Sequence, residues 1–194
     1  MNTEFEATFT DINKDNLRKR LKDIGADLVT KERLMRRWTL DFEHPREDYH
    51  RWARVRDEGD QVTATFKQHA IDKSKAGIEH QKEIEIVVDD FEATVKLLEA
   101  VGCERDMYQE SKREEWQKDG VEIVIDTWPH LEPFVEIEGP SESAVKKIAH
   151  ELNFDWDNVL FSATGALYKQ KYGALPSEAE GVEELRFDAD NPFI

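Results

Sequence analysis

The chain lacks the residues and segments that mark several classes of protein. Cys103 is the single cysteine among 194 residues, so an intramolecular disulfide and a cysteine-based zinc site are both excluded. No apolar run reaches the length of a transmembrane helix, and the first residues, which include Glu4 and Glu6, do not resemble a signal peptide. We therefore expect a cytoplasmic protein that does not act at a membrane.

Positive charge is also scarce. Lysine and arginine number 27 against 43 aspartate and glutamate residues, which gives a formal net charge of −16. General nucleic-acid binders are normally basic, so a nucleic-acid partner is not expected. A phosphorylated small molecule is compatible with this charge, because a local basic site can lie within an acidic shell.

What the chain does contain is a set of short segments that alternate between apolar and ionic residues, as strands with one buried face do. The segments are residues 4–9, 52–56, 62–67, 83–88, 121–126 and 134–138. One or two such strands would fit a solvated sheet face. Because there are six, and because cations and anions are segregated by strand, we expect the charged faces to meet.

An internal repeat indicates how these strands are arranged. A Glu-x-Glu strand at residues 4–6 precedes a helical pattern that ends at Gly25, and a second one at residues 83–85 precedes a helical pattern that ends at Gly102. A tryptophan follows at the matching offset in each half. Repeats of this kind decide the fold, so the chain is expected to consist of two similar halves.

The predicted fold is α+β. We expect a closed antiparallel eight-stranded tunnel barrel built from the two halves, with helices packed outside, over residues 1–172. Residues 173–194 are rich in Glu and Asp and are expected to form a loosely held acidic C-terminal tail.

The interior of such a barrel would carry two kinds of ionic side chain. Its carboxylates would be Glu4, Glu6, Glu83, Glu85, Asp126, Glu136 and Glu138, and its cations Arg54, Arg56, Lys67 and Arg113. Clustered carboxylates prefer hard cations such as Mg²⁺ or Mn²⁺, and arginine and lysine bind phosphate. This combination suits phosphoryl chemistry. Each motif alone is also typical of a solvated face or a cross-strand ion pair, so the joint pattern carries the hypothesis.

The motifs occur in a defined order along the chain. They are Glu4-Phe5-Glu6, Trp38-Thr39-Leu40-Asp41, Arg54-Val55-Arg56, Thr65-Phe66-Lys67, Glu83-Ile84-Glu85, Lys112-Arg113, the strand that ends at Asp126, and Phe134-Val135-Glu136-Ile137-Glu138. In order and spacing this series resembles the CYTH superfamily, also called triphosphate tunnel metalloenzymes. The superfamily includes class IV adenylyl cyclases, thiamine triphosphatases and inorganic triphosphatases.

The resemblance implies an enzyme that uses Mg²⁺ or Mn²⁺ to act on a small-molecule triphosphate, either by cyclising a nucleotide or by hydrolysis. It implies that Glu4, Glu6 and Glu136 hold metal, assisted by Asp126 and Glu138. The residues it implies for phosphate binding are Arg54, Arg56, Lys67, Lys112 and Arg113, with Glu83 and Glu85 as supporting carboxylates. The chain length and the Lys112-Arg113 context favour the cyclase-like branch. No catalytic residue is assigned, and the oligomeric state stays open, with a homodimer as one alternative.

Two departures from the family pattern keep other functions open. Thr8 stands where the family has the lysine of Glu-x-Glu-x-Lys, and Ser111 stands where many members have another lysine. The first alternative is a non-catalytic binder of triphosphate or polyphosphate, and the second is a structural barrel whose inner charges only pair with one another.

Overall fold

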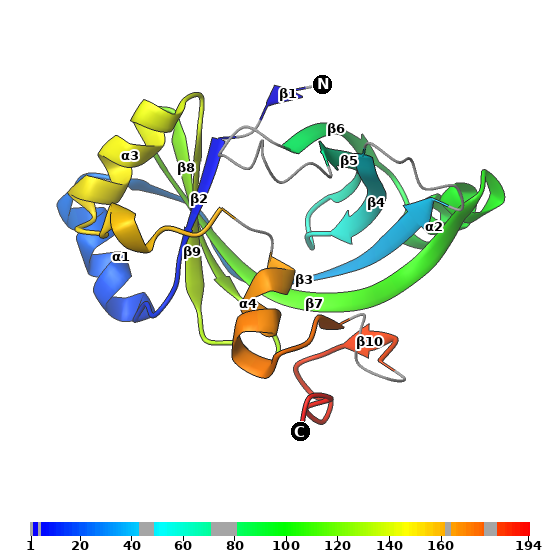
Figure 1. Ribbon diagram of the computed structural model, residues 1–194. Coiled ribbons are helices and arrows are strands. Elements are labelled where there is room, and N and C mark those ends of the chain that lie inside the picture. Colours follow the sequence, from blue (N-terminus) through cyan, green and yellow to red (C-terminus); the bar gives the residue numbers. More distant parts are fainter. Residues whose placement is uncertain (1, 4, 43–48, 71–80, 162–163, 177–181) are drawn as a thin grey trace.

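The computed structural model describes residues 2–3, 5–42, 49–70, 81–161, 164–176 and 182–194 (Figure 1). Its main element is one strongly curled antiparallel sheet. The strands in sheet order are β1 (Asn2–Thr3), β6 (Gln81–Val88), β5 (Val62–Ala70), β4 (Tyr49–Asp57), β3 (Asp27–Phe42), β7 (Cys103–Lys118), β8 (Val121–Thr127), β9 (Phe134–Gly139) and β2 (Phe5–Phe9). A short strand, β10 (Glu184–Leu185), pairs in parallel with β7.

The helices begin at side-chain caps that the sequence supplies. Helix α1 (Lys14–Asp23) begins after Asn13, and α2 (Phe91–Ala100) begins after Asp90; in both, the cap oxygen accepts a backbone hydrogen bond of the first turn. Helix α3 (Glu142–Glu151) begins after Ser141 in the same way. Helix α4 (Thr164–Tyr172) follows the 3-10 turn Trp156–Asn158.

Apolar residues of the strands face the helices on the convex side of the sheet. Figure 1 shows α1 and α3 beside β2, β8 and β9, and α2 near the far end of β7. Under α1 and α3 lies the larger core, in which Leu17, Ile123 and Ile137 are fully buried. A second core, with Val55 and Val95, lies under α2. Where a helix covers the sheet, the alternation of the strands turns their apolar side chains outward to that helix and leaves their ionic side chains on the concave side. On β6, Ile84 and Ile86 are exposed instead.

The element order confirms the repeat. Strand, helix and three strands occur as β2-α1-β3-β4-β5 and again as β6-α2-β7-β8-β9. The two longest strands, β3 and β7, pair with each other along most of their length and join the halves. Trp116 packs into the core under α1, and Trp38 packs against the core under α2.

The α+β fold with a curled antiparallel sheet is therefore confirmed, with β2 to β9 as its eight main strands. The two edges of the sheet are β1 and β2, which are consecutive in the chain: β1 pairs with β6, and β2 pairs with β9. In the described part of the chain, no helix is long and apolar enough to cross a membrane.

The expectation of a loosely held C-terminal tail is wrong for the described residues of that segment. Leu185 is 1 % exposed and packs with Met107 of β7, while the Phe193 ring stacks on Tyr172 with 4.6 Å between ring centres. The acidic composition concealed these apolar anchors, because Leu185 and Phe193 are widely spaced among polar residues. The segment covers an apolar cluster that would otherwise face water.

Candidate functional site

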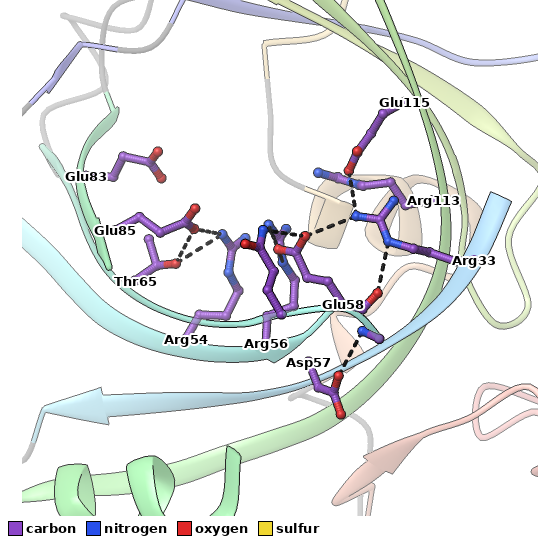
Figure 2. A network of polar contacts seen from close by, with 12 residues as sticks. Arg33, Arg54, Arg56, Asp57, Glu58, Thr65, Glu83, Glu85, Arg113 and Glu115 are labelled. Carbon is purple, nitrogen blue, oxygen red and sulfur yellow. Dashed lines mark hydrogen bonds and ion pairs between the residues drawn. The ribbon is translucent and has the colours of Figure 1, made fainter. Parts of the chain in front are cut away.

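Alternate residues of β4, β5 and β6 project from the concave side of the sheet, and Figure 2 shows Arg54 and Arg56 pointing into this space beside Glu85. Arg54 is 8 % exposed. Its Nη2 lies 3.2 Å from Thr65 Oγ1 and 3.3 Å from Glu85 Oε2. The buried Nε of Arg54 has no hydrogen-bond partner among the described residues. Burial and, after it, the nearby Arg56 lower the pKa of Arg54 to about 10.

A chain of ion pairs extends from Arg56 across the sheet (Figure 2). Glu58, which is 4 % exposed, accepts from Arg56 Nε at 2.8 Å and from Arg33 Nη2 at 3.0 Å. Arg33 Nη2 also donates to Glu115 at 3.0 Å. Burial alone would raise the pKa of Glu58, but the two guanidinium groups outweigh it, and the pKa is lowered. Glu58 is therefore held as a carboxylate that fixes Arg56.

Lys67 and Glu83 meet at another part of the same face. The Nζ of Lys67 lies 3.0 Å from Glu83 Oε2 and 5.9 Å from the centre of the Trp52 ring. Lys67 is 8 % exposed, so this pair is largely shielded from water. Both residues lie where the alternation predicted.

Arg113 binds two of the predicted metal ligands. It holds Asp126 with two hydrogen bonds, of 2.9 Å from Nε and 2.5 Å from Nη2, and reaches Glu136 at 3.0 Å. Burial alone would lower the pKa of Arg113, but Asp126 and Glu136 outweigh it, so the pKa is raised. Arg113 thus lies at the boundary between the cationic and the anionic part of the concave side.

The carboxylates of β2, β8 and β9 crowd one another. Burial, and then the nearby Glu6 and Asp126, raise the pKa of Glu136 to about 8. Burial, and then Glu122 and other carboxylates, raise the pKa of Glu138 to about 7. In the sheet register Glu6 lies opposite Glu138. Such a group of hard oxygen donors with excess negative charge attracts a cation.

The oxygen donors of Glu6, Glu136 and Glu138 suit Mg²⁺ or Mn²⁺. No group of three or more His, Cys, Asp or Glu side chains is arranged to hold a metal ion, as far as the described residues go. Glu4, which was predicted to bind metal, lies outside the described residues. The residues present therefore fit a hard cation by their chemistry. To coordinate one, the carboxylate groups of Glu6, Glu136 and Glu138 would have to move closer together.

One predicted site residue lies apart from the others. The Nζ of Lys112 lies 4.7 Å from the centre of the Phe187 ring in the C-terminal segment. Its neighbour Arg113 points to the opposite side of β7 because successive side chains of a strand alternate. The structure brings together the described members of the predicted set other than Lys112.

Among the residues of the concave side that the sequence analysis missed are Arg33, Arg37 and Glu58. Glu58 continues the alternation of Arg54 and Arg56, and this spacing is a signal that could have found it. Arg37 lies opposite Arg56 in the sheet and donates from Nε to Gln109 at 2.7 Å. Burial, and then Arg54, Arg56 and Arg113, lower its pKa well below the usual value.

The concave side thus holds Arg37, Arg54, Arg56 and Arg113 near one another beside a group of carboxylates. Guanidinium groups in a shielded space can bind a polyanion through paired hydrogen bonds.

The sole cysteine, Cys103, is buried in the core under α2, and burial raises the pKa of its thiol, so it does not offer a nucleophile.

Solved structures with this fold come from several organisms. A conserved hypothetical protein from Pyrococcus furiosus is 22 % identical, with a TM-score of 0.66, and the match covers 84 % of this chain and 99 % of that one. A candidate adenylate cyclase from Vibrio parahaemolyticus is 12 % identical, with a TM-score of 0.70 and coverage of 87 % and 98 %. A candidate adenylyl cyclase from Hippeastrum with a dominant triphosphatase activity is 15 % identical, with a TM-score of 0.57 and coverage of 92 % and 99 %.

Among curated proteins no match was found. At these identities the solved structures establish the shared fold and not a shared reaction. The sequence pattern of the CYTH domain matches residues 5–164, which include nearly all of the curled sheet. The chain therefore belongs to the CYTH family.

Proposed function

We propose that this protein is a metal-dependent enzyme that acts on a triphosphate, either as a nucleoside triphosphate cyclase of the class IV type or as a triphosphate hydrolase. The observation that carries the proposal is the meeting of two opposite charge clusters. Arg37, Arg54 and Arg56 gather on one part of the concave side, and Glu6 and Glu136 gather on another. Phosphoryl transfer depends mainly on placing charge around the phosphates, and this arrangement supplies charge of both signs.

A purely structural role for the inner charges fits the contacts less well. Charges that only neutralised one another would be paired throughout, since an unpaired buried charge is costly. Arg37 instead forms no ion pair with a described carboxylate, and its pKa is lowered despite the attraction of Asp126, while the pKa of Glu136 is raised. Both features are expected of a site whose charges are completed by a ligand.

In this proposal Glu6 and Glu136 would hold Mg²⁺ or Mn²⁺, with Asp126 and Glu138 as neighbours and Glu4 as a further predicted ligand. A divalent ion bound there would neutralise phosphate oxygens as charge develops on them. Arg54, Arg56 and Lys67 would bind and orient the phosphate chain. We further propose that the sheet closes into a tunnel, because its two edges are strands that follow each other in the chain.

Thr8 favours a second candidate, a non-catalytic binder of triphosphate or polyphosphate. Thr8 is 2 % exposed and lies opposite Glu136 in the sheet, so the position that the family fills with lysine carries no cation. If this absence limits the protein, Thr8→Lys should raise triphosphate affinity or turnover. Thr8→Met is the control, because it adds similar bulk without charge and should raise neither.

A turnover screen tests the proposal. ATP, thiamine triphosphate and tripolyphosphate would each be offered with Mg²⁺ and with Mn²⁺, and phosphate, pyrophosphate and cyclic AMP would be measured separately. Pyrophosphate with cyclic AMP identifies a cyclase, and phosphate identifies a hydrolase. Binding without product favours the non-catalytic binder, and the absence of both binding and product would overturn the proposal. The screen includes both reactions named for solved proteins of this fold, since the protein from Hippeastrum has a dominant triphosphatase activity and that from Vibrio parahaemolyticus is a candidate adenylate cyclase.

A further inference from the structure

Arg37 is held in place by neutral groups. It lies on β3 between Arg56 of β4 and Gln109 of β7 in the sheet register. Its Nε donates to Gln109 Oε1 at 2.7 Å, and its guanidinium carbon lies 4.3 Å from the centre of the Trp128 ring. An amide and an aromatic face therefore orient this cation without neutralising it.

The cations around Arg37 make its position unfavourable in the absence of a ligand. Like charges directly opposite each other on neighbouring strands repel, and Arg37 lies opposite Arg56. No carboxylate is within ion-pair distance of Arg37 in the described part of the chain, whereas Arg56 is paired with Glu58. Burial, and then Arg54, Arg56 and Arg113, lower the pKa of Arg37, and the opposing effect of Asp126 is smaller. Because arginine does not lose its proton in proteins, the repulsion remains until an anion binds.

We propose that Arg37 is an anion-binding side chain that, together with Arg56 on the neighbouring strand, grips a phosphoryl group of the triphosphate. The inference rests on the proposed function and adds a residue that none of the sequence motifs contains. With Nε bound to Gln109, the two Nη groups are left to donate to phosphate oxygens, and neither makes a hydrogen bond to another described residue.

The next residue along the chain provides a matched control. Arg36 points to the opposite side of β3, where it pairs with Asp57 at 2.8 Å and its side chain is 52 % exposed. Arg37→Gln and Arg36→Gln therefore change the net charge equally, and only the first removes a cation from the concave side. Both variants would be titrated with tripolyphosphate by calorimetry, and their ligand-free stability would be measured by urea unfolding.

Arg37→Gln should weaken tripolyphosphate binding by roughly 10- to 150-fold, the range of a charged hydrogen bond. Its ligand-free stability should be equal to or higher than that of the wild type, because the repulsion is removed. Arg36→Gln should change the affinity less than about twofold, since exposed charges are screened. Arg37→Lys should recover part of the affinity, because it keeps the charge but not the paired donors.

Several outcomes would overturn the inference. Wild-type affinity in Arg37→Gln would remove Arg37 from the site and leave the proposed function standing. A strongly destabilised ligand-free Arg37→Gln would show a structural role, and equal losses in Arg36→Gln and Arg37→Gln would show long-range electrostatics. If the wild-type protein itself does not bind tripolyphosphate, the proposed function fails first.

Discussion

The Nε of Arg54 has no hydrogen-bond partner among the described residues, so it can donate to a ligand in the proposed site. Replacing Arg54 by alanine should weaken triphosphate binding by ~1.5–3 kcal/mol, the scale of a charge-assisted hydrogen bond. The ligand-free fold should change less, because Glu85 is one-third exposed and water can solvate it once Arg54 is gone. Calorimetry would measure the affinity. Arg105→Ala is a suitable control, since Arg105 pairs with Glu99 on the outer side of the molecule.

The raised pKa values of Glu136 and Glu138 predict how stability depends on pH. With folded values of about 8 and about 7, both groups bind a proton more tightly in the folded than in the unfolded protein. This stabilisation is complete below the ordinary carboxyl pKa and is lost as the pH rises through the folded values. In metal-free buffer, the free energy of unfolding should therefore fall from about pH 5, just above the ordinary carboxyl pKa, to about pH 8.

Urea unfolding with a chelator across this range would measure the slope. Glu136→Gln should flatten it, because the amide cannot ionise. Glu114 serves as the contrast: Arg18 binds it and its pKa is lowered, so it is already ionised in both states across this range. A slope that persists unchanged in Glu136→Gln would show that another group titrates.

Sequence reasoning at this scale succeeded where alternation was regular. The alternation of residues assigned Arg54, Arg56 and Lys67 to the inner face. This assignment was correct because β4 and β5 pair without a break in register. Arg37 could not be assigned in the same way. The register between β3 and β7 shifts at three places, and each shift changes which residues face inward. Adjacent arginines in such a strand cannot be given a face from sequence alone.

At the scale of elements, the C-terminal segment shows how composition can mislead. Leu185 of β10 is 1 % exposed, so Leu185→Ala should lower the free energy of unfolding by ~2–5 kcal/mol, the usual cost of emptying a core position. Ile194 is 96 % exposed, and Ile194→Ala should leave the stability unchanged. Thermal or urea unfolding of the two variants decides the matter. Equal stability of Leu185→Ala and wild type would restore the view of a loosely held tail.

Helices and their ends were predicted more closely than strand lengths. Helix ends depend on local signals such as Gly25 and Gly102, which the sequence displays. The length of β3 and β7 depends on their pairing with each other, which joins residues far apart in the chain. Local signals cannot report such pairing.

For the whole molecule, metal binding should couple to stability. Glu6 lies on β2 and Glu136 on β9, at one edge of the curled sheet. A metal held between them would stabilise the folded state by mass action, increasingly with concentration above its dissociation constant. The melting temperature should therefore rise with Mn²⁺.

The variant with both Glu6→Gln and Glu136→Gln should lose this rise, whereas Glu104→Gln, on an exposed carboxylate of β7, should keep it. Each variant would be compared with its own metal-free baseline, because replacing Glu136 changes stability by itself. An undiminished rise in the double variant would place the metal elsewhere.

The pairing of β2 with β9 also has a consequence for synthesis on the ribosome. Residues 5–9 are translated before their partner strand at residues 134–139, and α1, α2 and six strands of the sheet lie between the two in the chain. Until then, the apolar side of the first strand lacks its neighbour, since Phe5 and Phe9 belong to the core that β9 helps to form. The nascent chain therefore carries an unpaired strand until β9 has been made, and folding of the full sheet must await translation of β9.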